Sequence, residues 1–488
     1  MIIGVGALVR LPDLTAPLWY DEVFSARVTA LPLPRLLNAT AGDVHPPGYY
    51  LFLKGWCLLF SNSELALRVP SMLAGIALIY LVYRLASALS LTHPACVGAS
   101  VITALAPFQV YYSQEARPYA VVMAALVLAA LGLVERRWWW FIIGILGALY
   151  CNTMALFVVI GLGLAGLWLA RNDRRYWFSI GAIGLGYLPA LLMMVLTQAG
   201  NVSNGYWILP PFSPGKLISV IDDLLFFSPK TPFVFASATL TAFAVYLILS
   251  RFSLPAVLDS PALYSLYSAG VIPICLAAIV SMLWTPVLLS RAMAGAAPFL
   301  YLLISWAATQ DKLTARMWFA GAGLVMASVL LGGIFTNHMG RVDWLAGNDT
   351  IQPGDAVYHT SLGSYLPYQY YWPNNPHYLM PQTHSIANDL TPQTKKALSI
   401  DSAEIPLDNV ICQTPARRWV LGLTLSALNT PADAETITAL QTQYAPYRVK
   451  HAQTVFSDGG LYVVNCPAAL QSTQNQTIPQ NSQSTPRK

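Results

Sequence analysis

Residues 117–170 read RPYAVVMAALVLAALGLVERRWWWFIIGILGALYCNTMALFVVIGLGLAGLWLA, and this stretch decides the fold class. Apolar runs at 117–134, 137–151 and 153–170 follow one another with only short polar interruptions. The hydrocarbon core of a bilayer is about 30 Å thick, and an apolar helix of roughly 20 residues crosses it. The stretch therefore predicts consecutive membrane-spanning helices.

Comparable apolar runs occur elsewhere in residues 1–335, near 66–89, 95–112, 177–197, 231–250, 262–284, 287–307 and 315–335. The composition agrees, because 56% of the residues are hydrophobic and only 10% are charged. Soluble domains carry roughly 25% charged residues. We expect an α-helical polytopic membrane protein with about ten or eleven transmembrane helices. The apolar stretch Met1–Leu11 is too short to cross alone, so it is either the remnant of a first helix whose start is missing, which we favour, or a helix capped by its neighbours. A signal peptide is the rival interpretation of that stretch, but it has no basic region and no small-residue cleavage site before Trp19.

Basic residues in the short loops predict the orientation. With a cytoplasmic N-terminus, most of them fall on the cytoplasmic side: Arg84, Arg136, Arg137, Arg171, Arg174, Arg175, Arg251, Lys312 and Arg316. The loops 12–65, 113–116 and 198–230, and the chain after about 337, then face the periplasm, the cell exterior or a lumen. Five lone cations also fall on this outer face, against the distribution of the other basic residues, and each requires an explanation: Arg27, Lys54, Arg68, Arg117 and Arg291.

The chain changes character after Thr336, where polar residues and turn signals return. Residues 1–335 therefore form the expected membrane domain, and residues 336–468 a small soluble α/β domain on the outer face. We expect strands of this domain at 356–359, 419–423 and 461–465. The remaining residues 469–488, rich in Gln, Ser, Thr and Pro, are expected to be disordered.

Two of the six cysteines, Cys412 and Cys466, lie in the expected soluble domain. An oxidising compartment would allow a disulfide between them. Two cysteines carry no spacing signature, so the sequence leaves this pairing open.

The polar side chains that could carry chemistry gather in the first outer loop, residues 12–65. Asp21 and Glu22 are adjacent, and Asp43 and His45 follow some twenty residues later. Neighbours on a helix project about 100° apart, so we expect one acid of the first pair to react while the other holds structure. Two prolines after His45 stiffen the loop and position that side chain.

Structural roles compete with functional ones at each of these positions. Asp21 could N-cap a short helix at 22–31, and Asp43 could cap a turn. His45 could be a satisfied loop residue. Glu115 and Arg117 could form an interfacial ion pair beside a tyrosine belt.

Three motifs stand in order along the chain: Trp19-Tyr20-Asp21-Glu22, Asp43-Val44-His45-Pro46-Pro47-Gly48-Tyr49-Tyr50 and Ser113-Gln114-Glu115-Ala116-Arg117-Pro118-Tyr119. Together they resemble the C-type family of membrane glycosyltransferases. That family includes protein O-mannosyltransferases and the transferases that add aminoarabinose to lipid A. The resemblance covers roughly residues 1–335, and the tail contributes little to it. The chain departs from the family in its truncated first helix.

The resemblance implies transfer of a sugar from a polyprenyl-phosphate donor to a lipid, glycan or protein acceptor on the outer face, by single displacement with inversion. It implies Asp21 as the catalytic base, with Glu22 as the second catalytic candidate. Arg117 and Arg291 are the candidates for binding the donor phosphate, because guanidinium groups match phosphate oxygens in a bidentate way. The candidates for orienting substrates are Asp43, His45, Tyr112 and Glu115, and we expect Glu115 to fix Arg117.

No cofactor is certain from the sequence. Acids and a histidine on one loop leave a divalent metal open. Against a metal, the outer loops contain no evident Asp-x-Asp motif, and a lipid-phosphate monosugar offers no diphosphate for a metal to bridge. The expected partners are the lipid-linked donor, the acceptor and membrane lipids. Nucleic acid is not expected, because the net charge is only +5 over 488 residues.

Other functional classes compete with this interpretation. A polytopic transporter would place ionisable residues near the middle of the bilayer on broken helices, often with repeat symmetry. Here the acids fall in an outer loop. An oligosaccharide polymerase or ligase of the cell envelope is the nearest alternative among transferases, and the length of the donor glycan would distinguish it.

Overall fold

The computed structural model describes most of the chain, in the following ranges: 1–43, 45–198, 200, 212–227, 234–335, 350–381, 390–413, 416, 418–426, 431–453 and 457–466. The chain divides into two compact units. The first comprises residues 1–342 together with 390–398, and the second comprises 343–389 together with 399–488.

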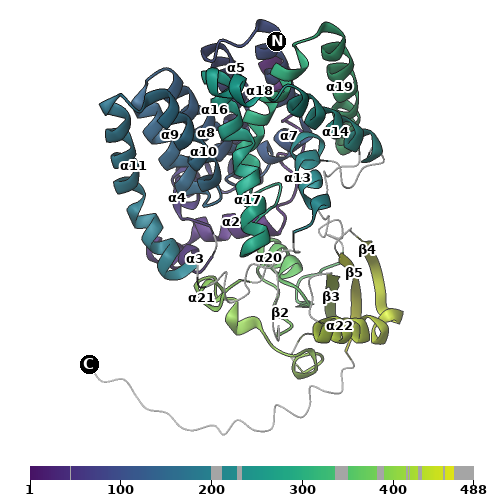
Figure 1. Ribbon diagram of the computed structural model, residues 1–488. Coiled ribbons are helices and arrows are strands. Elements are labelled where there is room, and N and C mark those ends of the chain that lie inside the picture. Colours follow the sequence, from purple (N-terminus) through teal and green to yellow (C-terminus); the bar gives the residue numbers. More distant parts are fainter. Residues whose placement is uncertain are drawn as a thin grey trace, which may run out of the picture. The chain divides into compact units, whose positions relative to one another are not determined.

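The first unit is built from helices, and apolar helices such as α5, α8, α9 and α10 pack together in it (Figure 1). In chain order its elements are α1 (Ile2–Leu8), α2 (Tyr20–Ala30), α3 (Leu33–Gly42), α4 (Gly48–Phe60), α5 (Glu64–Ala88), α6 (His93–Leu105), α7 (Pro107–Ser113), α8 (Tyr119–Val134), α9 (Trp138–Cys151), α10 (Ala155–Ala170), α11 (Arg174–Met193), the π-helix η1 (Met194–Gln198), α13 (Pro214–Phe226), α14 (Val234–Ser250), α15 (Leu254–Asp259), α16 (Pro261–Gly270), α17 (Ile272–Leu283), the 3-10 turn η3 (Ala294–Ala296), α18 (Ala297–Ala308), α19 (Lys312–Phe335) and α21 (Pro392–Ala397).

Among the described residues, four helical segments are long and apolar enough to cross a membrane: α5, α11 with η1, α16 with α17, and α19. The bent pair α6 and α7, which meet at 54°, counts as a fifth if it forms one broken span. Five shorter apolar segments accompany them: α8, α9, α10, α14, and η3 with α18. The chain is therefore a mostly helical integral membrane protein, and the predicted fold class is confirmed.

Close packing between neighbouring helices depends on small residues. A Cβ atom added to Gly144 of α9 would lie 2.5 Å from the carbonyl oxygen of Ala125 in α8. Apolar helices in lipid gain little from the hydrophobic effect on one another, so close backbone contact is a main source of their association. The glycine allows α9 to pack directly against the backbone of α8.

The break between α6 and α7 is held by a buried arginine from the end of α1. Pro107 has no N–H group, which frees carbonyl groups in the turn before it. Arg10 is fully buried and donates to the carbonyl oxygens of Thr103 at 3.0 Å and Ala104 at 2.8 Å. Its Nε donates to Ser113 Oγ at 3.1 Å. These bonds fix the end of α7, directly before the third sequence motif.

The predicted span at 287–307 differs from the structure, because regular helix begins only with η3 at Ala294. Pro286 cannot donate a helical hydrogen bond. The backbone amides of Val287 and Leu288 instead donate to Ser281 Oγ, each at 2.9 Å. As a result, Arg291 lies on a non-helical segment before α18.

The second unit contains a five-stranded sheet in the order β2-β1-β3-β5-β4. Its elements are β1 (Ala356–His359), α20 (Leu362–Tyr371), β2 (His377–Leu379), η4 (Asp401–Ala403), η5 (Leu407–Asn409), β3 (Arg418–Ser426), α22 (Pro431–Gln443), η6 (Ala445–Tyr447), β4 (Arg448–Gln453) and β5 (Ser457–Asn465). β1 pairs in parallel with β2 and β3, whereas β5 pairs antiparallel with β3 and β4. The three predicted strands correspond to β1, β3 and β5.

Alternation along β3 builds a core on both faces of this sheet. Trp419 and Leu421 pack into one buried cluster, and Val420 packs into another. Cys412 and Cys466 form a disulfide with a Cα–Cα distance of 5.4 Å. The expected disordered tail, 469–488, lies outside the described residues.

Candidate active site

Three charged side chains from distant parts of the sequence meet in the first unit. The carboxylate oxygen Oδ2 of Asp21 lies 3.5 Å from Arg291 Nη1 and 3.8 Å from Arg117 Nη2. The Arg117 side chain is only 4% exposed, whereas those of Asp21 and Arg291 are 15% and 29% exposed. The cluster is therefore accessible to a ligand on the side of Arg291. It joins one acid to two candidate phosphate-binding cations.

The local structure of α2 directs Asp21 toward these arginines. The helix begins at Tyr20, and Trp19 is its N-cap residue. Glu22, at the third helical position, supplies one half of a capping box, because its carboxylate accepts from the Trp19 backbone amide at 3.5 Å. Capping is thus performed at Trp19 and Glu22, and the alternative role of Asp21 as the N-cap does not match this helix.

Glu22 forms a buried ion pair with Arg68 of α5. Arg68 Nε and Nη2 donate to the two carboxylate oxygens at 2.7 and 2.6 Å, and neither side chain is exposed. Glu22 Oε1 also accepts from the backbone amide of Ala116 at 2.9 Å. The remaining donors of Arg68 bind backbone carbonyl groups of the preceding loop: Asp13, Leu14, Ala16 and Pro17. The pair thereby ties the first loop to the backbone next to Arg117.

His45 connects Asp43 to Arg117. Its Nδ1 lies 3.1 Å from Asp43 Oδ2, and its Nε2 lies 3.4 Å from Arg117 Nη2. Since the guanidinium group can only donate, this geometry favours the tautomer with the proton on Nδ1 and a lone pair on Nε2. Arg117 Nη1 also donates to the hydroxyl of Tyr50 at 3.4 Å. Burial raises the pKa of Tyr50, so that hydroxyl stays neutral.

The other two candidates lie close by in the sequence segment that ends at Arg117. Tyr112 packs edge-to-face against Phe108 and Tyr119, with ring centroids 4.6 Å apart in both pairs. Glu115 is buried, with 1% exposure. Arg117 Nη1 also donates to the backbone carbonyl oxygen of Asp21 at 3.5 Å, and the carbonyl oxygen of Arg117 accepts from Ser71 Oγ at 3.1 Å. The role of Glu115 in fixing Arg117 stays a prediction.

The structure supplies a partner for each of the five lone cations assigned to the outer face. Arg68, Arg117 and Arg291 pair with the acids described above. Lys54 donates to the carbonyl oxygens of Thr29 and Leu31 at the end of α2, at 2.9 and 2.8 Å. Arg27 donates to the carbonyl oxygen of Leu398 at 2.7 Å. Each of these cations, which the count of basic residues in the loops did not explain, therefore has a bonded partner within the fold.

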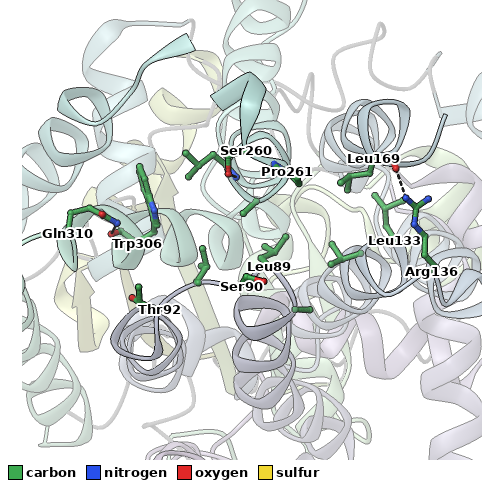
Figure 2. A pocket seen from close by; sticks show the side chains of 15 residues that line it. Leu89, Ser90, Thr92, Leu133, Arg136, Leu169, Ser260, Pro261, Trp306 and Gln310 are labelled. Atoms are coloured by element: carbon green, nitrogen blue, oxygen red, sulfur yellow. Dashed lines mark hydrogen bonds between the residues drawn. The ribbon is translucent and has the colours of Figure 1, made fainter. Parts of the chain in front are cut away.

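The loops assigned to the opposite face also meet one another. Arg84 lies 2.8 Å from Glu135, and Arg136 lies 3.9 Å from Asp173. A cavity of about 550 Å³ lies among these loops, where Arg136 donates to the carbonyl oxygen of Leu169 (Figure 2). None of the residues that line this cavity belongs to the Asp21 cluster.

The described side chains do not form a metal centre. In the ranges that the structure covers, no three His, Cys, Asp or Glu residues gather in a way that could hold a metal ion. Asp43 and His45 contact each other as a pair.

Sequence reasoning assigned no site role to Tyr50 or Arg68. Tyr50 is the last residue of the second motif, and this position could have marked it as a candidate site residue. Arg68 was noted only as a lone outer-face cation. The cost of such a charge next to a membrane predicts an acidic partner, but the distance of 46 residues to Glu22 hides which acid it is.

Comparisons with known proteins agree with this architecture. Residues 44–198 match the model of the family described as dolichyl-phosphate-mannose-protein mannosyltransferase. The fold is similar to that of ArnT from Cupriavidus metallidurans in the apo state, with 11% identity, a TM-score of 0.55, and coverage of 94% of this chain and 97% of that chain. It is also similar to ArnT from the same organism bound to undecaprenyl phosphate, with 12% identity, a TM-score of 0.57, and coverage of 98% of each chain. No curated protein sequence matches the chain.

The family match covers residues 44–198, whereas the structural likeness extends over nearly the whole chain. The chain has the fold of the C-type membrane glycosyltransferases over nearly its whole length, and the resemblance found in its motifs is confirmed. The matched segment includes His45, Tyr50, Arg68 and Arg117, whereas Asp21 lies before it and Arg291 after it.

Proposed function

We propose that this protein transfers a sugar from a polyprenyl-phosphate donor to a lipid, glycan or protein acceptor on the outer face of the membrane. The contact of Asp21 with both Arg117 and Arg291 is the observation that carries the proposal. The family match and the likeness to an ArnT that binds undecaprenyl phosphate support the class of donor. We also propose that the active site and the second unit both lie on this outer face.

The two arginines bind the donor phosphate in this proposal. Arg291 is the more exposed of the two and makes the first contact, while Arg117 lies deeper and is held by His45 and Tyr50. The Asp21 carboxylate contacts both guanidinium groups. An incoming phosphate competes for both guanidinium groups and leaves Asp21 available to the acceptor.

The reaction is a single displacement at the anomeric carbon of the sugar. The acceptor hydroxyl oxygen forms a bond to that carbon, and the bond between the carbon and the phosphate oxygen breaks with inversion. Polyprenyl phosphate leaves with the bonding electron pair, and its added charge is stabilised by Arg117 and Arg291. Asp21 accepts the proton of the acceptor hydroxyl.

Asp43 and His45 orient Arg117, while Glu22 shapes the loop through Arg68. His45 is a second conceivable base, because a histidine held by a carboxylate on Nδ1 keeps a lone pair on Nε2. In this structure that lone pair already faces Arg117. Asp21 contacts both arginines, so we assign the base to Asp21 and a positioning role to His45.

Comparison of glycans and lipids from cells with and without the gene tests the proposed activity. Mass spectrometry of envelope lipids, glycans and proteins should reveal a product that lacks one sugar in the deletion strain and recovers it when the wild-type gene is returned. Identical lipid, glycan and protein profiles in both strains would defeat the proposal. A mass difference equal to a long repeat glycan would instead favour a ligase or polymerase.

A further inference from the structure

A short segment far along the chain is bound to the end of α3. The helix α21 begins after Thr391, whose side chain accepts from the Thr394 backbone amide at 3.2 Å. In sequence this segment lies between β2 and β3, yet residues 390–398 belong to the first unit. We refer to residues 390–398 as the strap.

Hydroxyl groups of the strap bind the carbonyl groups that end α3. Thr391 Oγ1 donates to the carbonyl oxygen of Gly42 at 2.8 Å, and Thr394 Oγ1 donates to that of Ala39 at 3.0 Å. The last four carbonyl groups of a helix have no partner within the helix. Both threonines are buried, at 6% and 0% exposure, so their hydroxyls contribute specific bonds rather than surface contacts.

The strap is secured at its other end by two arginines of the first outer loop. Arg35 Nη2 donates to the carbonyl oxygen of Ala397, and Arg27 Nη2 donates to that of Leu398, both at 2.7 Å. Cations bind well at helix C-termini, where carbonyl groups are unpaired. The strap therefore has defined bonds at both ends and lies in one register on α3.

Close packing at Gly42 makes this contact sensitive to shape. A Cβ atom added there would lie 2.6 Å from Thr394 Oγ1 and 2.8 Å from Thr391 Oγ1. Both distances are shorter than an ordinary van der Waals contact, so a larger residue at this position would displace the strap.

The end of α3 leads directly into the candidate active site. Asp43 follows Gly42 and contacts His45, which contacts Arg117. From another direction, Gln198 at the end of η1 donates to the carbonyl oxygens of Thr40 at 3.1 Å and His45 at 3.2 Å. The loop that carries the Asp43–His45 pair is thus held between the strap and η1.

We propose that Thr391 and Thr394 are positioning residues for sugar transfer: by binding the end of α3 they set Asp43 and His45 against Arg117. This inference rests on the proposed function, because it concerns the same site. Loss of either hydroxyl lets the loop shift while the helices of the membrane unit remain packed. Displacement of a positioning group by about 1 Å can cost about a hundredfold in rate.

The test compares Thr391→Val and Thr394→Val with Thr391→Ser and Thr394→Ser, and uses Thr438→Val as a matched control. Thr438 is exposed on α22, and its hydroxyl donates only within its own helix in the described contacts. At equal protein level, the valine variants should lower the amount of cellular product about tenfold or more. The serine variants and the control should retain it.

Two further measurements separate positioning from a general structural role. Hydrogen exchange of the peptide covering residues 40–50 should rise in the valine variants, while the melting temperature should stay close to that of the wild type. Normal product in the valine variants, or product lost together with a fall in melting temperature, overturns the strap proposal. Unchanged envelope lipids, glycans and proteins after deletion of the whole gene would instead overturn the proposed function itself.

Discussion

The carboxylate of Glu22 accepts hydrogen bonds from two nitrogen atoms of Arg68, at 2.6 and 2.7 Å, and neither side chain is exposed. This relationship separates the roles of two adjacent acids. Glu22 is enclosed by its partner and by the amide of Ala116, whereas Asp21 projects toward the two arginines of the candidate site.

Removal of the Glu22 carboxylate should destabilise the protein. Glu22→Ala leaves the Arg68 charge buried without its acid, and breaking a buried pair in this way costs about 3–5 kcal/mol. Thermal unfolding in detergent or nanodiscs measures the effect. The double variant Glu22→Gln/Arg68→Met should recover part of the loss. A melting temperature for Glu22→Ala equal to that of the wild type contradicts a structural role for the pair.

Asp21→Asn should abolish most transfer and leave the fold intact. The amide keeps the shape of the side chain but cannot accept the acceptor's proton, and loss of general-base catalysis costs about 10²- to 10⁴-fold in rate. Product analysis in complemented cells measures this change, with thermal unfolding as the check on folding. Asp311→Asn is the matched control, because Asp311 caps α19 through the Thr314 amide and asparagine also caps helices well. If His45→Gln stops transfer while Asp21→Asn does not, the base is the histidine.

Arg291→Ala should weaken binding of undecaprenyl phosphate. A charge-assisted hydrogen bond is worth about 1.5–3 kcal/mol, so the dissociation constant should rise about ten- to a hundredfold. Binding to protein in nanodiscs, measured against undecaprenol, isolates the contribution of the phosphate. Arg316→Ala on the exposed face of α19 serves as the control cation. Equal weakening for undecaprenol, or none for the phosphate, would argue against a phosphate clamp at Arg291.

The second unit should lose stability as the pH falls from about 6.5 toward 4. Burial, together with His377, lowers the pKa of His359 well below its ordinary value, and burial lowers the pKa of His377 to about 4. His359 Nε2 lies 3.1 Å from His377 Nδ1, so the pair accommodates protons poorly. The unfolded chain takes up protons near pH 6.5, which favours unfolding below that pH by about 1–3 kcal/mol.

Hydrogen exchange of peptides covering β1 to β3 at pH 7 and pH 5, corrected for the intrinsic rates, measures this loss in the intact chain. The difference in protection between the two pH values should shrink in His377→Gln. It should persist in the control His93→Gln, because His93 lies at the start of α6 in the first unit. Equal protection at both pH values in the wild type would refute the expectation.

Local sequence patterns were sufficient for most elements of the fold. The predicted span near 66–89 corresponds to α5, and the predicted strand at 356–359 coincides with β1. The strands β2 and β4 escaped prediction. β2 has only three residues, and β4 reads RVKHAQ, which lacks the apolar alternation of a half-buried strand. Both derive their structure from the neighbour to which they bond.

The candidate site was only partly visible in the sequence. Asp21, His45 and Arg117 stand in short motifs, so their residue types alone drew attention to them. The Glu22–Arg68 pair and the strap depend on contacts between residues 46 and about 350 positions apart. No local pattern encodes such partners, because hydroxyl and guanidinium groups bind any acceptor that the fold brings near.

The sequence by itself determined that this chain lies in a membrane, where most of its helices fall, and which motifs hold the candidate site residues, because hydrophobicity and backbone preference act over a few neighbouring residues. Only the tertiary structure decided which of two adjacent acids meets the arginines, which one is enclosed, and what holds the Asp43–His45 pair in place. Those outcomes depend on the paired burial of charges and hydrogen-bonding groups, and the partner of each group is known only after the chain has folded.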